Sequence, residues 1–234
     1  MHKMLKKGNK NMGNVRVIEI KESVFADNDA TSKAIREKMS AQGTLFLNVM
    51  SGPGSGKTTF LTTLINRLKD QMKIGEMDVD IETSLDAQRV ADLTGVESIQ
   101  IHNCGLCHID ADMVSRALLE YDTENLDLLI LENIGNLVCP AEFDTGASKN
   151  VMILSVPEGH DKPLKYPLMF RICDAVLINK IDVLPYFDFD MEQVKEYIHQ
   201  RNPQAKVFPI SAKTGEGMDA WTKWLAAQVT AWKN

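Results

Sequence analysis

The amino-acid sequence predicts an α/β protein in which helices cover both faces of a mostly parallel sheet. Short apolar segments alternate with amphipathic helical segments through most of the chain, and a glycine-rich stretch separates a strong strand candidate from the helix that follows it. The chain has 234 residues. This length is enough for one core of about six or seven strands and does not require a second domain.

The segment before the glycine-rich stretch is predicted to be an arm and a lead-in helix. A polar stretch runs to about Asn14, a short apolar segment follows at residues 15–20, and helical periodicity spans residues 29–42. We therefore expect two parts: an N-terminal arm and lead-in helix at residues 1–44, and a domain that carries the chemistry at residues 45–234.

The glycine-rich stretch has the properties of a phosphate-binding P-loop. A strand is predicted at residues 45–50, the loop at 51–58 and a helix at 59–68. Glycines let successive backbone N–H groups curl around phosphates at the positive end of a helix. The general pattern has glycine where this chain has Ser51, whereas the rest of the pattern is intact. The sequence thus predicts the P-loop NTPase fold, with a phosphate site formed by Gly52, Gly54, Ser55, Gly56, Lys57, Thr58 and Thr59.

Magnesium is expected beside the phosphates. Residues 126–131 predict a strand buried on both faces, and Glu132 follows at the edge where open α/β sheets bind ligands. The P-loop threonine is a ligand to Mg²⁺, and the P-loop lysine reaches the β- and γ-phosphates. We therefore predict that Thr58 and Glu132 meet the ion and that Lys57 binds phosphate.

A guanine-binding site is predicted at the ends of two later strands. Residues 174–178 predict a buried strand that leads into Asn179, Lys180 and Asp182. A carboxylate can accept from two adjacent guanine N–H groups that adenine lacks, and a site of this kind discriminates by about 10⁴-fold. The order of the motifs favours GTP, with an ATP-driven metallocluster ATPase as an alternative. A second candidate base-binding loop follows residues 206–210 and consists of Ser211, Ala212 and Lys213.

The helical segments supply the layers around the sheet. An apolar stripe on the last helix predicts core packing rather than partner binding. The stripe consists of Trp221, Trp224, Leu225 and Trp232. Cys173, at the end of a separate apolar stretch, is predicted to be a buried thiol. Helices opened by an acidic or small residue are predicted at residues 86–93, 110–119, 190–201 and 217–232.

Composition and charge limit the partners. With 26 basic and 32 acidic residues the net charge is −6, which argues against a nucleic-acid partner and against an anionic membrane surface. No apolar run is as long as a membrane span, and the first residues lack the apolar core of a signal peptide. We therefore expect a cytoplasmic protein whose 4 cysteines are reduced thiols or metal ligands rather than disulfides.

Three residues predict a site for a soft metal ion. Cys107 and His108 are adjacent in a predicted loop, and Cys139 lies in a neighbouring loop downstream of Glu132. Thiolate and imidazole together select Zn²⁺, Ni²⁺ or copper over Mg²⁺. An adjacent Cys-His pair alone is more often a packing feature, but the position of Cys139 favours a metal site. The C-x-x-C-H pattern from Cys104 also matches covalent haem attachment, which would require an export signal that the sequence does not show.

These motifs resemble those of the hydrogenase nickel-insertion GTPases, the HypB family within the SIMIBI class of P-loop GTPases. The resemblance covers about residues 45 to 228, and the segment around Cys139 is far more specific than a P-loop. The matching segments are DIETSLDA at 80–87, CHIDA at 107–111, ENIGNLVCPAEFD at 132–144, PEGHDKPLKYP at 157–167, NKIDVLPY at 179–186 and SAKTGEGM at 211–218.

The resemblance implies a GTPase that forms a homodimer on binding GTP, holds nickel or zinc at the dimer interface and helps to load nickel into [NiFe]-hydrogenase. It implies two partners, a HypA-like metallochaperone and the hydrogenase large subunit or its maturation complex. Asp80 and Glu132 become candidates for binding Mg²⁺ or orienting water, beside Lys57. The ligands of the transferred metal become Cys107, His108 and Cys139.

The sequence departs from the family in two places and leaves alternatives open. The arm has only His2, so a store of many nickel ions is not expected. Cys104 stands where the family usually has glycine, with His102 nearby, and both are equally compatible with accessory ligands and with tolerated loop residues.

Lys162 and Lys165 are equally compatible with a switch or dimer contact and with ordinary solvated lysines. A UreG-like urease GTPase and a non-catalytic metal-binding protein are alternatives; the Cys-His pair without proline and the Cys139 segment favour the HypB type.

Overall fold

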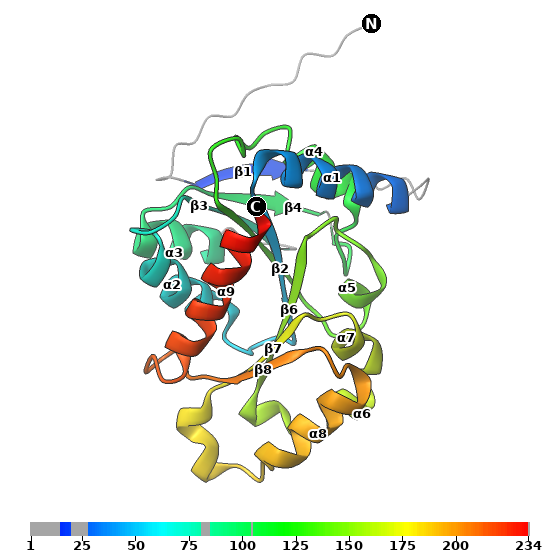
Figure 1. The fold of residues 1–234 in the computed structure, drawn as a ribbon, viewed down its shortest axis with the longest axis vertical. Helices are drawn as coiled ribbons and strands as arrows, with labels where there is room; N and C mark the ends of the chain where they lie inside the picture. The colour runs from blue at the N-terminus through cyan, green and yellow to red at the C-terminus, as the bar shows by residue number, and fades with distance from the viewer. Residues whose placement is uncertain (1–14, 20–27, 81–84, 104, 234) are drawn as a thin grey trace, which may run out of the picture.

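A parallel sheet of eight strands forms the centre of the molecule, and helices cover both of its faces (Figure 1). The computed structural model describes residues 15–19, 28–80, 85–103 and 105–233, with the backbone alone at 15–19 and at Asp80. The predicted α/β fold with a parallel sheet is confirmed. The sheet has eight strands rather than the six or seven expected from the length of the chain.

The strands lie in the order β1-β4-β3-β5-β2-β6-β7-β8, and every neighbouring pair is parallel. Parallel strands place their carboxyl ends at one edge of the sheet, so the segments after β2, β3, β5 and β7 meet there. The strands are Val15–Glu19 (β1), Leu45–Ser51 (β2), Ile74–Asp80 (β3), Ser98–His102 (β4), Leu128–Gly135 (β5), Lys149–Ser155 (β6), Ala175–Asn179 (β7) and Lys206–Pro209 (β8).

The helices form two outer layers. α2, α3 and α9 pack on one face of the sheet, whereas α1 and α4 cover the other face beside β3 and β5, and α7 and α8 cover it beside β6 and β7 (Figure 1). The α-helices are Asn28–Gln42 (α1), Lys57–Leu68 (α2), Leu85–Thr94 (α3), Ala111–Ala117 (α4), Cys139–Glu142 (α5), Lys162–Lys165 (α6), Pro167–Arg171 (α7), Met191–Arg201 (α8) and Met218–Trp232 (α9); the 3₁₀ helices are Val156–Glu158 (η1) and Ile181–Tyr186 (η2).

The core follows from the alternation of side chains along the strands. In β2, Leu45 and Leu47 pack against α2, while Phe46 points to α1 on the opposite face. Full burial of one such side chain contributes about 1.5–3 kcal/mol. Trp221 on α9 is completely buried, and the other tryptophans of α9 pack against the same cluster, so the predicted packing role of this stripe is confirmed.

Two local expectations are wrong, and both concern the segment after residue 131. Glu132 does not follow its strand but lies inside it, because β5 continues to Gly135, which pairs with Ser51 of β2. Cys139 does not lie in an open loop but is the first residue of the short helix α5. Pro140 favours this helix start because its fixed φ suits the first helical turn.

The structure also bears on the expectations about membrane spans, Cys173 and the division of the chain. Among the described residues, none of the helices has the length and apolarity that crossing a bilayer requires. Cys173 is buried and its thiol donates to the carbonyl of Met169. Helix α1 contributes Ile35 and Met39 to the same core as the sheet, and the division of the chain between residues 44 and 45 stays a prediction.

Candidate functional site

The P-loop joins β2 to α2 and is shaped for an anion. Gly56 has a φ of 96°, in the left-handed region that favours glycine. A Cβ added there would lie 2.9 Å from Nδ2 of Asn179. The first turn of α2 has no side-chain cap, so its N–H groups face the loop, as phosphate binding at a helix N-terminus requires.

Ser51, which replaces the first glycine of the general pattern, contacts the P-loop lysine. Nζ of Lys57 donates to Oγ of Ser51 over 3.0 Å. The serine hydroxyl in turn donates to the carbonyl of Gly52 over 2.8 Å. The ammonium group is therefore held above the loop, at a cavity of about 240 Å³ that is lined by Gly54, Ser55, Gly56, Lys57, Thr58, Thr59, Asp86, Arg89 and Glu132.

Buried carboxylates next to this cavity supply oxygen ligands. Oγ1 of Thr58 is 3.4 Å from Oε1 of Glu132, and carboxylate oxygens of Glu76, Asp78 and Glu132 lie within 4.8 Å of one another. Burial raises the pKa of Glu76 well above its usual range, and the charges of Asp78 and Glu132 raise it further. Hard oxygen donors next to a hydroxyl fit Mg²⁺, whose charge would offset their repulsion.

The sequence did not single out Glu76 or Asp78 as site residues. The signal is the period of two along β3: Glu76 and Asp78 occupy alternate positions, and alternate residues of a strand point to one face of the sheet. Asp78 is paired in register with Glu132 of β5. The backbone of Asp80 ends β3, but its side chain, predicted to meet Mg²⁺ or water, lies outside the described part of the structure.

Arg89 is a second residue that sequence reasoning missed. It lies on α3, its side chain is exposed, and it lines the phosphate cavity together with Asp86 of the same helix. The signal was available, because an arginine three residues after an acidic helix start lies on the same helix face. The cavity therefore has cationic side chains on two sides, from Lys57 and from Arg89.

The predicted guanine motif is braced against the P-loop. Nδ2 of Asn179 donates to the carbonyl of Ser55 over 2.9 Å, and Nζ of Lys180 donates to the carbonyl of Gly54 over 2.7 Å. The Oδ1 atom of Asn179 accepts from the N–H of Ala212 over 3.0 Å. One side chain of β7 thus connects both candidate base-binding loops to the phosphate loop.

Asp182 is oriented by Ser211, whose Oγ donates to Oδ1 of the carboxylate over 2.7 Å. Lys180 adopts a positive φ of 64°, the left-handed conformation, at the turn that presents Asp182. The neighbouring cavity has a volume of about 270 Å³ and lies beside the phosphate loop. It is lined by Gly56, Thr59, Asn179, Lys180, Asp182, Val183, Ala212 and Lys213.

The predicted soft-metal ligands come together at the same edge of the sheet. Sγ of Cys107 lies 2.7 Å from Sγ of Cys139, and 3.9 Å from Nδ1 of His108. Cys107 follows β4 and Cys139 opens α5, so two separate segments supply the thiols. The hydrogen bond to Cys139 raises the pKa of the Cys107 thiol, and burial raises it further.

His108 is held by an aromatic stack. Its ring lies parallel to that of Phe143, with centroids 3.7 Å apart and planes 10° apart. Burial lowers the pKa of His108, which favours the neutral ring that binds metal. Nε2 is buried without a hydrogen-bond partner in the described structure, whereas Nδ1 faces the Cys107 sulfur. Nδ1 is therefore the nitrogen that can share an ion with the thiols.

Residues 132–139 connect the phosphate site to the thiols. A Cβ added at Gly135 would lie 3.3 Å from Cα of Pro53 in the P-loop. Nδ2 of Asn136 reaches the carbonyl of Cys107 over 3.5 Å. The segment therefore lies against both the P-loop and the loop that carries Cys107.

The structure leaves other candidate residues away from these clusters or outside the described chain. Cys104 lies outside the described residues, and His102 ends β4 with a partly exposed side chain. Nζ of Lys165 pairs with Asp161 at 2.5 Å, and Nζ of Lys162 lies 5.5 Å from the ring centroid of Tyr166. Both lysines thus have local contacts, and their switch or dimer role stays a prediction.

Comparison with known proteins gives consistent matches. The model of the CobW/HypB/UreG nucleotide-binding domain matches residues 45–209. The hydrogenase maturation factor HypB of Escherichia coli K12 is 42% identical over 217 residues, which cover 93% of this chain and 74% of that protein. The hydrogenase/urease maturation factor HypB of Helicobacter pylori J99 is 41% identical over 212 residues, covering 89% and 86%. The crystal structure of Helicobacter pylori HypB in complex with nickel superposes with a TM-score of 0.81 at 39% identity, covering 88% of this chain and 96% of that one.

Proposed function

The chain belongs to the CobW/HypB/UreG family and, within it, to the HypB hydrogenase maturation factors, and from this premise we propose that it is a GTP-hydrolysing nickel metallochaperone. In this proposal, GTP binding and hydrolysis control a site that takes up nickel and releases it during [NiFe]-hydrogenase maturation. The observation that carries the proposal is the segment 132–139, which begins beside Thr58 of the P-loop and ends at the Cys107 thiol.

The nucleotide half of the proposal follows from the chemistry of phosphoryl transfer. Water attacks the γ-phosphorus, the bond to the β–γ bridging oxygen breaks, and GDP and phosphate leave. Lys57 and the N–H groups at the start of α2 would stabilise the charge on the phosphoryl oxygens. Asp80 and Glu132 are the candidates for orienting the water. Asp182 would select guanine by accepting from its paired N–H groups.

The carboxylates of β3 and β5 are proposed to hold magnesium with Thr58. When bound, Mg²⁺ neutralises the β- and γ-phosphate oxygens. Glu132 and Asp78 would provide oxygens directly or through water. Because Glu132 lies at the start of the segment 132–139, we expect its position to change when a γ-phosphate is bound.

Nickel is the proposed cargo, with zinc as the competing ion. Cys107, His108 and Cys139 offer two sulfurs and one nitrogen, a donor set that suits both ions. Three protein ligands leave room for exchange or for a ligand from a second copy of the chain. We propose that GTP binding drives homodimerisation at this edge, and that a HypA-like metallochaperone and the hydrogenase large subunit, or its maturation complex, are the donor or acceptor of the metal.

Titration with nickel in the GDP state and in the state with a non-hydrolysable GTP analogue tests the proposal, with the oligomer mass measured in each. We expect the GTP analogue to shift both the nickel affinity and the dimer fraction. Coupling between binding sites is reciprocal, so nickel must change nucleotide affinity or dimerisation by the same free energy. Identical nickel affinity in both states, with unchanged mass, would sink the proposal.

Urease maturation is a second candidate function, because the similar Helicobacter pylori J99 protein carries the name hydrogenase/urease maturation factor. The same GTPase and metal site would serve either acceptor enzyme. Reconstitution of nickel transfer to an apo-hydrogenase large subunit and to an apo-urease, in parallel, separates the two. Transfer to urease alone would favour the second candidate.

A further inference from the structure

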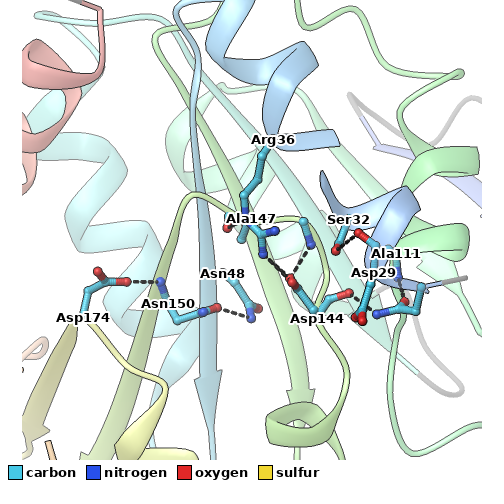
Figure 2. Close-up of polar contacts among 11 residues, drawn as sticks. Asp29, Ser32, Arg36, Asn48, Ala111, Asp144, Ala147, Asn150 and Asp174 are labelled. Atoms are coloured by element: carbon cyan, nitrogen blue, oxygen red, sulfur yellow. Dashed lines mark hydrogen bonds and ion pairs between the residues drawn. The ribbon is translucent and has the colours of Figure 1, made fainter. Parts of the chain in front are cut away.

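Helix α1 contacts both segments that carry the metal ligands. The side chain of Asn28, its first residue, makes two hydrogen bonds: Nδ2 donates to the carbonyl of Asp144 over 3.0 Å, and Oδ1 accepts from the N–H of Ala111 over 2.9 Å. The partners of these two bonds, Ala111 and Asp144, are labelled in Figure 2. One amide group thus joins the segment after α5 to the start of α4.

A second residue of α1 fixes the segment after α5. Nη2 of Arg36 pairs with both carboxylate oxygens of Asp144, and its Nε donates to the carbonyl of Ala147 over 3.0 Å (Figure 2). Burial would raise the pKa of Asp144, but Arg36 and the N–H of Gly146 outweigh it, so the pKa lies below its usual value. The carboxylate is therefore charged and held at neutral pH.

The close approach of the loop after α5 to helix α1 depends on Gly146. Its φ is 81°, and a Cβ added there would lie 2.7 Å from Cβ of Ile35 on α1. Ile35 is buried. The loop after α5 is therefore shaped to sit directly on the helix.

Both segments are next to proposed metal ligands in the chain. Ala111 begins the helix that follows Cys107 and His108, and Asp144 follows Phe143, whose ring stacks on His108. The Cys139 helix leads into the same segment. Helix α1, which contributes no ligand itself, is therefore hydrogen-bonded to both ligand-bearing segments.

We propose that α1 acts as a clamp that sets the geometry of the Cys107, His108 and Cys139 site, and that Asn28 is its central positioning residue. The inference rests on the proposed function, because it assumes that these three residues bind nickel. Loss of Asn28 would let the two segments separate without removing a ligand. Asn28 makes its hydrogen bonds to Asp144 and Ala111 and not to the P-loop or the guanine motif, so GTP turnover should be unaffected.

The test compares nickel binding by the full chain and by Asn28→Ala, Asn28→Asp and Lys33→Ala. Lys33 is a matched control on α1, because its side chain is 76% exposed and pairs only with Glu37 of the same helix among the described residues. Affinity is measured by competition with a chromogenic chelator, and geometry by the thiolate-to-nickel charge-transfer absorption. GTP turnover without nickel reports whether each variant is folded.

Asn28→Ala is expected to weaken nickel binding by about tenfold, the size expected for two lost hydrogen bonds, and to shift the charge-transfer band. Asn28→Asp keeps the acceptor for Ala111 but cannot donate to Asp144, so an intermediate loss is expected. Lys33→Ala should match the parent chain. All variants should keep GTP turnover.

The outcomes distinguish a failure of the clamp from a failure of the proposed function. An unchanged affinity and spectrum in Asn28→Ala, while Cys139→Ala loses nickel, would overturn the clamp and leave the proposed function standing. A parent chain that shows no thiolate-to-nickel band would overturn both. If Asn28→Ala fails to fold, Asn28→Asp with full turnover and an unshifted band contradicts the clamp.

Discussion

The nucleotide site and the proposed metal site lie at the same edge of one sheet but are built differently. The nucleotide site uses strand ends and a helix start, and Asn179 and Lys180 brace it from within by bonds to P-loop carbonyls. The metal site uses a loop and the start of a short helix, and its thiols are exposed or partly exposed. Its support comes from outside, through α1 and the ring of Phe143.

This difference suggests a division of labour. A site that must discriminate between similar nucleotides benefits from rigid, fully bonded groups. A site that must accept and release an ion benefits from ligands on segments that can move apart. The segment 132–139 joins the two, because one end belongs to the buried sheet and the other to the exposed thiols.

The largest expected effect tests the rigidity of the nucleotide site. Asp182→Asn should remove the preference for GTP over ATP and favour XTP, because an amide presents N–H to a base oxygen where the carboxylate accepted from guanine. A loss of about 10⁴-fold in GTP selectivity is expected. Competition binding with GTP, ATP and XTP measures it. Retained preference for GTP would show that another group reads the base.

The next effect separates catalysis from metal binding. Lys57→Ala removes the ammonium group above the P-loop and should lower the GTP turnover rate by about 10²–10³-fold. Nickel affinity without nucleotide should stay the same, since Lys57 contacts Ser51 rather than a metal ligand. Single-turnover phosphate release and nickel titration measure the two. A matching fall in nucleotide-free nickel affinity would contradict the separation of the sites.

The sequence predicted best those parts of the site whose residues are close together along the chain. The P-loop and the Asn179–Asp182 turn are each local, and their strands and helices were predicted within a few residues. The meeting of Cys107 with Cys139 could be expected because both segments follow parallel strands at one edge.

The contacts of helix α1, and those set by strand register, could not be predicted from the sequence. Nothing near Asn28 in sequence indicates that it joins Ala111 to Asp144, because that depends on how α1 lies across the sheet. Glu76 and Asp78 were missed although they alternate along β3, because only the register with β5 shows that they lie near Glu132. The extension of β5 past Glu132 likewise depends on its pairing with β2.

A third prediction addresses the exposed thiols. Cys139→Ala should weaken nickel binding by more than the 10–100-fold that loss of an outer-shell partner costs, because it removes a ligand. Cys173→Ala is the matched control, because the Cys173 thiol is buried and donates to the carbonyl of Met169 rather than contacting the proposed metal ligands. Chelator competition measures both. Equal affinities in the two variants would remove Cys139 from the metal site.

The smallest expected effect concerns the ion pair that holds α1 to the metal side of the molecule. The pKa of Asp144 is lowered in the folded chain, so its contribution to stability is present above the unfolded pKa and is lost as the pH falls through the folded value. Its side chain is 39% exposed, and solvent screening limits the contribution to about 0.5–1 kcal/mol. Urea unfolding should therefore show Asp144→Asn less stable than the parent chain at pH 7.

That difference should shrink as the pH falls below about 4, the usual range of an aspartate pKa, because the parent carboxylate then becomes protonated as well. Arg36→Met should remove the same contribution at pH 7, and the double variant should cost less than the sum of the two single changes. Additive costs would mean that the pair does not interact in solution. Since the nucleotide site has no part in this pair, GTP affinity in all three variants should equal that of the parent chain, which keeps the two sites separable even where they share one sheet.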